Sequence, residues 1–321
     1  VNTHVSAGSG TFQSNIFIGD SVFNHITGAK VWNGYEELQR NIGIGSGCFT
    51  TGLPIVWDHD SYYSNSDNIC IGAYAGGDLL SGNNYRVICI GYAAGRHIVT
   101  GNDGVFIGAY QMGGTGGYTI EAYNSVAIGS YIVTGNTAWA FNGSVAVGHY
   151  VYSNLNSYAN ACVIVIYSVG RYLKATTATT LVGSYHLDNS SNINNATYTT
   201  CVGYKIARQA SGDTSYSTLI GNDVGNCISG SLRDVFIGYD IVGKSDRTFE
   251  SQDNIFIGNK IASGTYGQVD KIHSNVCIGQ NVLHGNASGV VFIGQNAGQS
   301  WDYDYSQAKT VLIGQYAASG L

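Results

Sequence analysis

The sequence predicts an all-β protein, a parallel β-solenoid of about sixteen short coils. Three observations predict this fold. A short apolar motif that ends in glycine recurs along the 321 residues, its mean spacing is about 20 residues, and the composition is typical of short strands joined by turns. A unit of this size carries one reliable strand and cannot bury its own apolar face, so it has to stack on its neighbours.

The repeat consists of a polar residue, three apolar residues and a glycine. Asn15-Ile-Phe-Ile-Gly19 is its first example and Asn275-Val-Cys-Ile-Gly279 is a late one. We call the last residue the marker glycine and the apolar segment before it the marker strand. The marker glycines are Gly19, Gly45, Gly72, Gly91, Gly108, Gly129, Gly148, Gly183, Gly203, Gly221, Gly238, Gly258, Gly279, Gly294 and Gly314. One degenerate coil is expected to carry Val165 in the marker position. Spacings range from 15 to 27 residues, so the additional length must lie in loops.

Each position of the repeat has a physical interpretation. The polar residue ends a turn, because its side chain hydrogen-bonds to backbone. The two-residue period of a strand places the first and third apolar residues on one face and the middle one on the other. We expect the first and third residues to fill the interior. Glycine allows a tight turn or the close approach of another backbone. Apolar residues three positions after the glycine, such as Ala75 and Ile132, predict a second strand that faces the same core.

The middle position is therefore expected to face outward, although it is apolar in fifteen of sixteen coils. A strand with two apolar faces is buried on both, and a stripe of this length exceeds what a soluble monomer exposes. The sequence thus predicts a symmetric homo-oligomer about the fibre axis. The expected interface residues are Phe17, Cys70, Cys89, Phe106, Ala127, Ala146, Leu181, Leu219, Phe236, Phe256, Cys277, Phe292 and Leu312.

The composition excludes several classes of protein. A net charge of −6 gives no footprint for nucleic acid, and no apolar run is long enough to insert in a membrane. The 24 tyrosines and 11% charged residues argue against disorder. Seven widely spaced cysteines form no metal motif, so we expect no metal and no cofactor. The cysteines are interpreted as small buried apolar residues, with inter-chain disulfides as the alternative.

Two regions are expected. Residues 1–14 form an N-terminal lead-in and residues 15–321 form the solenoid, with long-loop coils over 15–72 and regular coils over 73–321. The chain lacks an initiator methionine, and both ends fall mid-pattern without an evident cap. We therefore expect a mature product, a piece of a longer fibre, or a subunit that stacks end to end.

The repeat resembles two known groups of fibrous proteins. Ser125-Val-Ala-Ile-Gly129 is similar to the repeat of trimeric autotransporter adhesin heads. Phe292-Ile-Gly-x-x-Ala-Gly298 is similar to repeats of bacteriophage tail fibres. This resemblance implies a left-handed β-roll, a homotrimer around one axis, and a role in attachment outside the cell, on a cell surface or a virion. The coils here are longer than those of the adhesin heads, so the loops are larger.

The candidate binding residues lie in the longest loops. They are Trp32, Tyr35, Trp57, Asp58, Asp60 and Tyr62 in the first two coils, and Trp301, Asp302 and Tyr303 before the last coil. Aromatic rings beside carboxylates are typical of sugar sites, so a cell-surface glycan or receptor is the expected partner. The alternative is that these rings pack the loops onto the solenoid. A tyrosine ladder, which we interpret as stacked structure, is expected along Tyr110, Tyr131, Tyr150, Tyr167 and Tyr185.

No enzymatic activity is expected. Glycoside hydrolysis needs two placed carboxylates, and the chain has only four glutamates, Glu36, Glu37, Glu121 and Glu250. The resulting hypothesis is a structural and adhesive fibre segment that binds a surface receptor through its loops. A purely structural shaft or an end-to-end filament subunit is the alternative, and a glycan-degrading tailspike is a weaker one.

Overall fold

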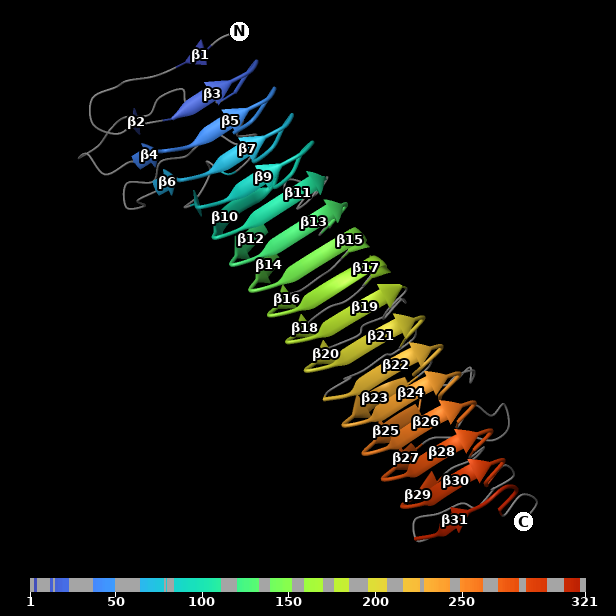
Figure 1. Cartoon of the computed structure of the whole chain (residues 1–321). Helices are drawn as coiled ribbons and strands as arrows, with labels where there is room; N and C mark the ends of the chain where they lie inside the picture. Colours follow the sequence, from blue (N-terminus) through green and yellow to red (C-terminus); the bar gives the residue numbers. More distant parts are fainter. Residues whose placement is uncertain are drawn as a thin grey trace. The chain divides into compact units, whose positions relative to one another are not determined.

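The computed structural model describes residues 3–4, 12–13, 15–22, 37–49, 64–77, 79, 84–110, 120–132, 139–151, 159–169, 176–184, 196–206, 216–225, 228–242, 249–261, 271–282, 287–298 and 309–317. These residues form an all-β parallel solenoid (Figure 1). The chain divides into two compact units, Val1–Ala161 and Cys162–Leu321. The described ranges contain no helix that is long and apolar enough to cross a membrane.

The first unit has about seven turns, built on two parallel sheets. The main sheet holds the marker strands β3 (Ile16–Ile18), β5 (Ile42–Ile44), β7 (Ile69–Ile71), β9 (Ile88–Ile90), β11 (Val105–Ala109), β13 (Val126–Ser130) and β15 (Val145–Val151). The second sheet holds β2 (Phe12–Gln13), β4 (Glu37–Gln39), β6 (Ser64–Ser66), β8 (Asn84–Tyr85), β10 (Ile98–Asn102), β12 (Ile120–Tyr123), β14 (Trp139–Asn142) and β16 (Ala159–Asn160). A short strand, β1 (Thr3–His4), pairs antiparallel with β3.

The second unit repeats this arrangement. Its marker strands are β17 (Val163–Val169), β19 (Thr180–Ser184), β21 (Thr200–Tyr204), β22 (Thr218–Asn222), β24 (Val235–Tyr239), β26 (Ile255–Asn259), β28 (Val276–Gln280), β30 (Val291–Gln295) and β31 (Val311–Ile313). Its other strands form one pair, β18 (Thr176–Thr177) with β20 (Ala196–Thr197), and one four-stranded sheet, β23 (Ile228–Leu232), β25 (Phe249–Gln252), β27 (Lys271–His273) and β29 (Ala287–Ser288).

The register between neighbouring coils places marker glycine on marker glycine. Gly238, for example, pairs with both Gly221 and Gly258. In the degenerate coil the prediction was one residue off, because Ile166 and not Val165 pairs with Gly183. The apolar run Val-Ile-Val-Ile in this coil fits the motif in two registers, and the pairing of its strand with β19 shows which register is formed.

Marker glycines lie where adjacent coils come closest. Their φ angles lie between 127° and 145°, a region that other residues rarely adopt. A Cβ atom on Gly258 would meet the carbonyl oxygen of Gly279 at 1.8 Å. The expected second strand after the glycine is not formed at Ala75 or Ile132, which are buried but lie outside strands. Among the described residues, a strand of another sheet instead comes just before each marker strand except β22 and β31.

The core is lined by the middle position of the marker strand, so the expected orientation of the strand was wrong. Phe106 is 0% exposed within the single chain. Twelve of the thirteen residues that were expected to form an oligomer interface are instead buried in the core of the chain, and the thirteenth, Leu312, is half-buried. The twelve are Phe17, Cys70, Cys89, Phe106, Ala127, Ala146, Leu181, Leu219, Phe236, Phe256, Cys277 and Phe292. Both faces of the strand are apolar, and alternation alone does not tell which face is inside.

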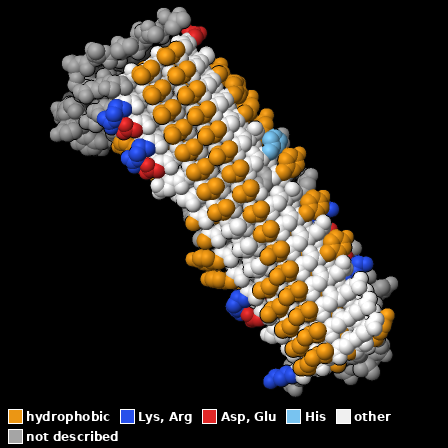
Figure 2. Space-filling view, in the orientation of Figure 1, with side chains coloured by type: hydrophobic (Ala, Val, Ile, Leu, Met, Phe, Trp, Pro, Cys, Tyr) orange, Lys and Arg blue, Asp and Glu red, His pale blue; other side chains and the backbone are white. Residues whose placement is uncertain are grey.

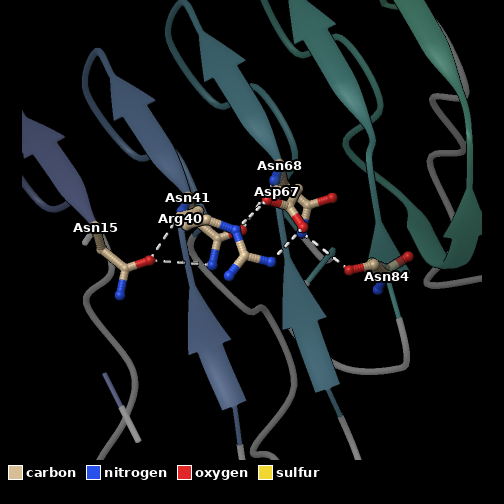
Figure 3. Close-up of polar contacts among 6 residues, drawn as sticks. All are labelled: Asn15, Arg40, Asn41, Asp67, Asn68 and Asn84. Atoms are coloured by element: carbon tan, nitrogen blue, oxygen red, sulfur yellow. Dashed lines mark hydrogen bonds and ion pairs between the residues drawn. The ribbon is translucent and has the colours of Figure 1, made fainter. Parts of the chain in front are cut away.

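A buried polar ladder runs beside this core and holds the coils in register. The Asn41 backbone N–H donates to Asn15 Oδ1 at 2.9 Å, and the Asn68 N–H donates to Asn41 Oδ1 at 3.0 Å (Figure 3). In the second unit the Asn275 N–H donates to Asn254 Oδ1 at 3.0 Å. These side chains bond to backbone as expected, but the backbone is that of the neighbouring coil and not of their own turn. The bonds satisfy polar groups that would be costly to bury unpaired.

Candidate interaction surface

The candidate surface is the outer face of the main sheet in each unit, formed by the first and third positions of the marker strands. In the first unit these are Ile16, Ile42, Ile69, Ile88, Val105, Val126 and Val145, with Ile18, Ile44, Ile71, Ile90, Ile107, Ile128 and Val147. In the second unit they are Val163, Thr180, Thr200, Thr218, Val235, Ile255, Val276, Val291 and Val311, with Val165, Val182, Val202, Ile220, Ile237, Ile257, Ile278, Ile293 and Ile313. Figure 2 shows these hydrophobic side chains in rows.

The outer face is half-buried to exposed in the single chain. Ile16 is 48% exposed, Ile128 is 39% exposed and Val165 is 42% exposed. In the first unit fourteen apolar side chains adjoin one another on this face, whereas exposed apolar side chains on a monomer are normally scattered singly. The expectation that these residues fill the interior was therefore wrong, and they form an apolar surface on the outside of the coils.

The side chains of the outer face are almost all β-branched. Valine, isoleucine and threonine are stiff at χ1 and pack well on a pleated surface. Successive coils repeat at the spacing of hydrogen-bonded strands, about 4.8 Å. The face is therefore a regular and rigid apolar grid with no charged member. One break in this pattern lies at Thr180, Thr200 and Thr218, which add hydroxyl groups to three consecutive coils.

Ion pairs border the outer face on the side where the marker strands begin. Arg40 contacts both carboxylate oxygens of Asp67, at 2.5 and 2.8 Å (Figure 3). Arg233 contacts Asp253 at 2.6 and 2.9 Å. Arg86 pairs with Asp103 in the same way. Hydrogen bonds from these arginines lower the pKa of all three aspartate carboxyl groups below its usual value. The charges thus lie at the corners of the coils, outside the apolar rows.

An aromatic column borders the outer face of the first unit on the other side. Ring centroids are 5.9 Å apart for Tyr74 and Tyr92, 5.0 Å for Tyr92 and Tyr110, 5.1 Å for Tyr110 and Tyr131, and 5.8 Å for Tyr131 and His149. The expected tyrosine ladder is confirmed between Tyr110 and Tyr131. The ring that follows Tyr131 in the column is His149. The side chains of Tyr150 and Tyr185 lie outside the described parts, and Tyr167 is exposed in the second unit.

The predicted ligand-binding residues Trp32, Tyr35, Trp57, Asp58, Asp60, Tyr62, Trp301, Asp302 and Tyr303 all lie outside the described residues. Their role in glycan binding therefore stays a prediction. Of the glutamates considered for catalysis, Glu121 lies exposed on β12. Within the described ranges, His, Cys, Asp and Glu side chains form no group of three or more that would hold a metal.

Six cysteines are buried and are not joined by disulfides, namely Cys48, Cys70, Cys89, Cys162, Cys201 and Cys277. Burial raises the pKa of Cys48 to about 11 and that of Cys201 to about 12. Their interpretation as small core residues is confirmed. Inter-chain disulfides at these six positions are excluded by burial inside the chain, and Cys227 lies outside the described residues.

Comparison of the chain with protein-family models, with curated proteins and with solved structures gave no match. The resemblance of the repeat to adhesin heads and phage fibres therefore stays a prediction. The solenoid and its outer face are the features on which a functional proposal rests.

Proposed function

We propose that the chain is a structural segment of an extracellular or virion fibre and that it assembles with copies of itself through the outer face. The observation that carries this proposal is the uncharged grid on the outer side of each unit, which is apolar except at Thr180, Thr200 and Thr218. In the proposed assembly the two units form one left-handed solenoid of sixteen coils, and three chains surround a common axis with their outer faces inward.

A second copy of the chain is the partner that the outer face fits best. A stable protein interface involves about 20–30 residues on each partner, and the outer faces of the two units provide 14 and 18 side chains. Two copies have the same coil spacing, so the side-chain rows of one sheet can pack between the side-chain rows of the other sheet, as in a dry interface between stacked sheets. The absence of charge from both rows removes repulsion between identical faces, which any closed symmetric assembly has to avoid.

Receptor binding is the adhesive part of this proposal and is assigned to the long loops before Gly72 and to the loop around Trp301. Their aromatic and acidic composition, which suits a glycan, supports it. End-to-end stacking is less well supported than lateral assembly. At the N-terminal end β1 already occupies the edge of β3, pairing Thr3 with Ile18 and His4 with Phe17.

The mass of the purified protein tests the assembly. Light scattering should give about three times the 34.0 kDa of one chain. The double variant Ile128→Lys, Ile257→Lys places charge on the outer face of both units, where burial of an unpaired charge is costly. It should be a monomer that keeps the circular dichroism spectrum of a β protein, because both side chains are exposed in the single chain.

The matched control is Glu121→Lys, which introduces the same residue at an exposed position of the second sheet. It should leave the trimer intact. A wild-type monomer, or a trimer that survives the double variant, would rule out the outer face as the interface. A glycan array then tests the loops separately.

A further inference from the structure

Two core thiols face each other on adjacent coils of the first unit. Cys70 on β7 and Cys89 on β9 are paired in register, and both are 0% exposed. Neighbouring strands lie about 4.8 Å apart, inside the ~4.4–6.8 Å between Cα atoms that a disulfide spans. Among the described cysteines, this is the one pair at directly opposed positions of neighbouring strands. The register neighbours of Cys201 are Leu181 and Leu219.

The surroundings of the pair leave the two sulfur atoms little freedom. Cys70 packs against Gly76 and Cys89 packs against Gly95, where an added Cβ atom would collide with each sulfur. The Cys89 thiol lies within hydrogen-bonding reach of the Cys70 thiol. A third thiol lies close by, but the Cys48 Sγ is turned to the backbone, where it donates to the carbonyl oxygen of Gly72 at 2.8 Å. Cys70 and Cys89 are thus each other's nearest partners for oxidation.

We infer that Cys70 and Cys89 form an intrachain disulfide when the chain folds in an oxidising compartment. The inference rests on the extracellular location in the proposed function, because disulfides persist in such surroundings. The bond would join two consecutive coils in the first unit and close a loop of the chain between residues 70 and 89. It makes this part of the solenoid resistant to opening, since cross-linking restricts the unfolded chain.

The oxidant is a small-molecule disulfide such as oxidised glutathione. One cysteine thiolate attacks it, forms a mixed disulfide and expels one glutathione thiolate. The second cysteine thiolate attacks the protein sulfur of the mixed disulfide and expels the other glutathione. The two protein thiols lose two protons and two electrons in total, and the two glutathione molecules that leave carry them as thiols.

This reaction has to take place before the coils stack. Burial, and then the hydrogen bond to Cys89, raise the pKa of the Cys70 thiol in the folded chain, which removes the reactive thiolate. The folded and reduced protein is therefore inert to the same oxidant. The redox state of the pair records the conditions under which the chain folded.

The test is to refold the denatured full chain with reduced and oxidised glutathione and to refold a second sample with a reductant. After alkylation and digestion, the oxidised sample should yield one cross-linked peptide pair joining Cys70 to Cys89, about 2 Da lighter than the two reduced peptides. Its melting temperature should exceed that of the reduced sample by roughly 5–10 °C. Cys89→Ala should abolish both effects, and Cys201→Ala should abolish neither.

Native reduced protein treated with the same glutathione mixture should keep both thiols. A refolded sample in which all thiols are free, or in which Cys48 takes part in the cross-link, overturns the inference. Peptide mapping reads the bond in a monomer and in a trimer alike. Failure of the disulfide therefore leaves the light-scattering test of the fibre untouched, and failure of the trimer leaves the peptide map readable.

Discussion

At the scale of single residues, the marker glycines combine two separate requirements. Their backbone conformation is one that a side chain strains, and their Cα atoms lie against the backbone of the next coil. Gly258 and Gly314 allow the two requirements to be compared, because their backbone conformations are similar, with φ angles of 143° and 138°. A Cβ atom on Gly258 would collide with Gly279, whereas one on Gly314 would have nothing within 4 Å.

Gly258→Ala should therefore lower the free energy of unfolding by about 3–5 kcal/mol, since backbone strain and overpacking add. Gly314→Ala should lower it by about 1–2 kcal/mol, since only the strain remains. Urea denaturation of both variants measures the difference. Equal losses would show that close stacking adds nothing to the requirement for glycine.

Single residues also show where prediction from sequence succeeded. The glycine series located the marker strands, and the pairing of Gly203 with Gly221 and of Gly221 with Gly238 has the expected register. The sequence did not reveal which face is inside. The size of the side chains at each position could have indicated the inner face. The middle position varies in size from Gly43 to Phe106, as in a core where neighbouring residues compensate for one another. Phe49, for example, fills the space beside Gly43. The outer positions vary only among β-branched residues, as a flat surface requires.

At the scale of the structural elements, adjacent coils are joined at their corners by charge. The Arg40, Arg86 and Arg233 side chains each hold an aspartate of the following coil. These pairs are partly exposed, so each contributes little to stability and is screened by salt. They share one position of the repeat, so a slip of one coil against the next would separate the charges.

The effect of pH on these ion pairs has a definite sign. The pKa of Asp67, Asp103 and Asp253 is lower in the folded chain than the usual ~3.9 of an unfolded chain. Their contribution is therefore present above about pH 4 and is lost as the pH falls through the folded pKa. The triple variant with asparagine at all three positions should be slightly less stable than the wild type at pH 7. The difference in urea midpoint should vanish in acid and shrink in 1 M salt.

Asparagine is a suitable replacement, because it keeps the shape of aspartate and tolerates the positive φ angles of 58° to 61° at Asp67, Asp103 and Asp253. A difference in midpoint that stays constant from pH 7 to pH 2.5 would show that the three carboxylates act through packing and not through charge.

At the scale of the whole molecule, the proposed assembly is held by apolar contact and not by ion pairs. The oligomer mass should therefore be unchanged between 0.1 and 1 M sodium chloride, conditions that screen surface charges. It should fall on cooling at low protein concentration, because the hydrophobic effect weakens in the cold. Sedimentation velocity at both salt concentrations and at two temperatures measures this. Dissociation in 1 M salt would assign the interface to the Arg–Asp borders instead.

The fold could largely be predicted from the sequence, because every coil repeats the same short motif. With many copies of the motif, a single departure such as Ile166 does not obscure the pattern. The sequence did not locate the candidate interaction surface, because both faces of the marker strand are apolar and their composition does not show which face is outside. The candidate sugar-binding residues, among them Trp32 and Trp57, follow from composition alone and lie outside the described residues.

The stacking of marker strands also bears on how such a gene can change. Successive marker glycines are separated by 15 residues at one place and by 27 at another, yet each coil adds the same width of outer face. In the proposed assembly, recombination that inserts or deletes a whole coil would keep the lateral contacts of the other coils and change only the length of the outer face. Chains with different numbers of coils would leave apolar rows uncovered in a mixed assembly, so assemblies of chains of equal length would be favoured.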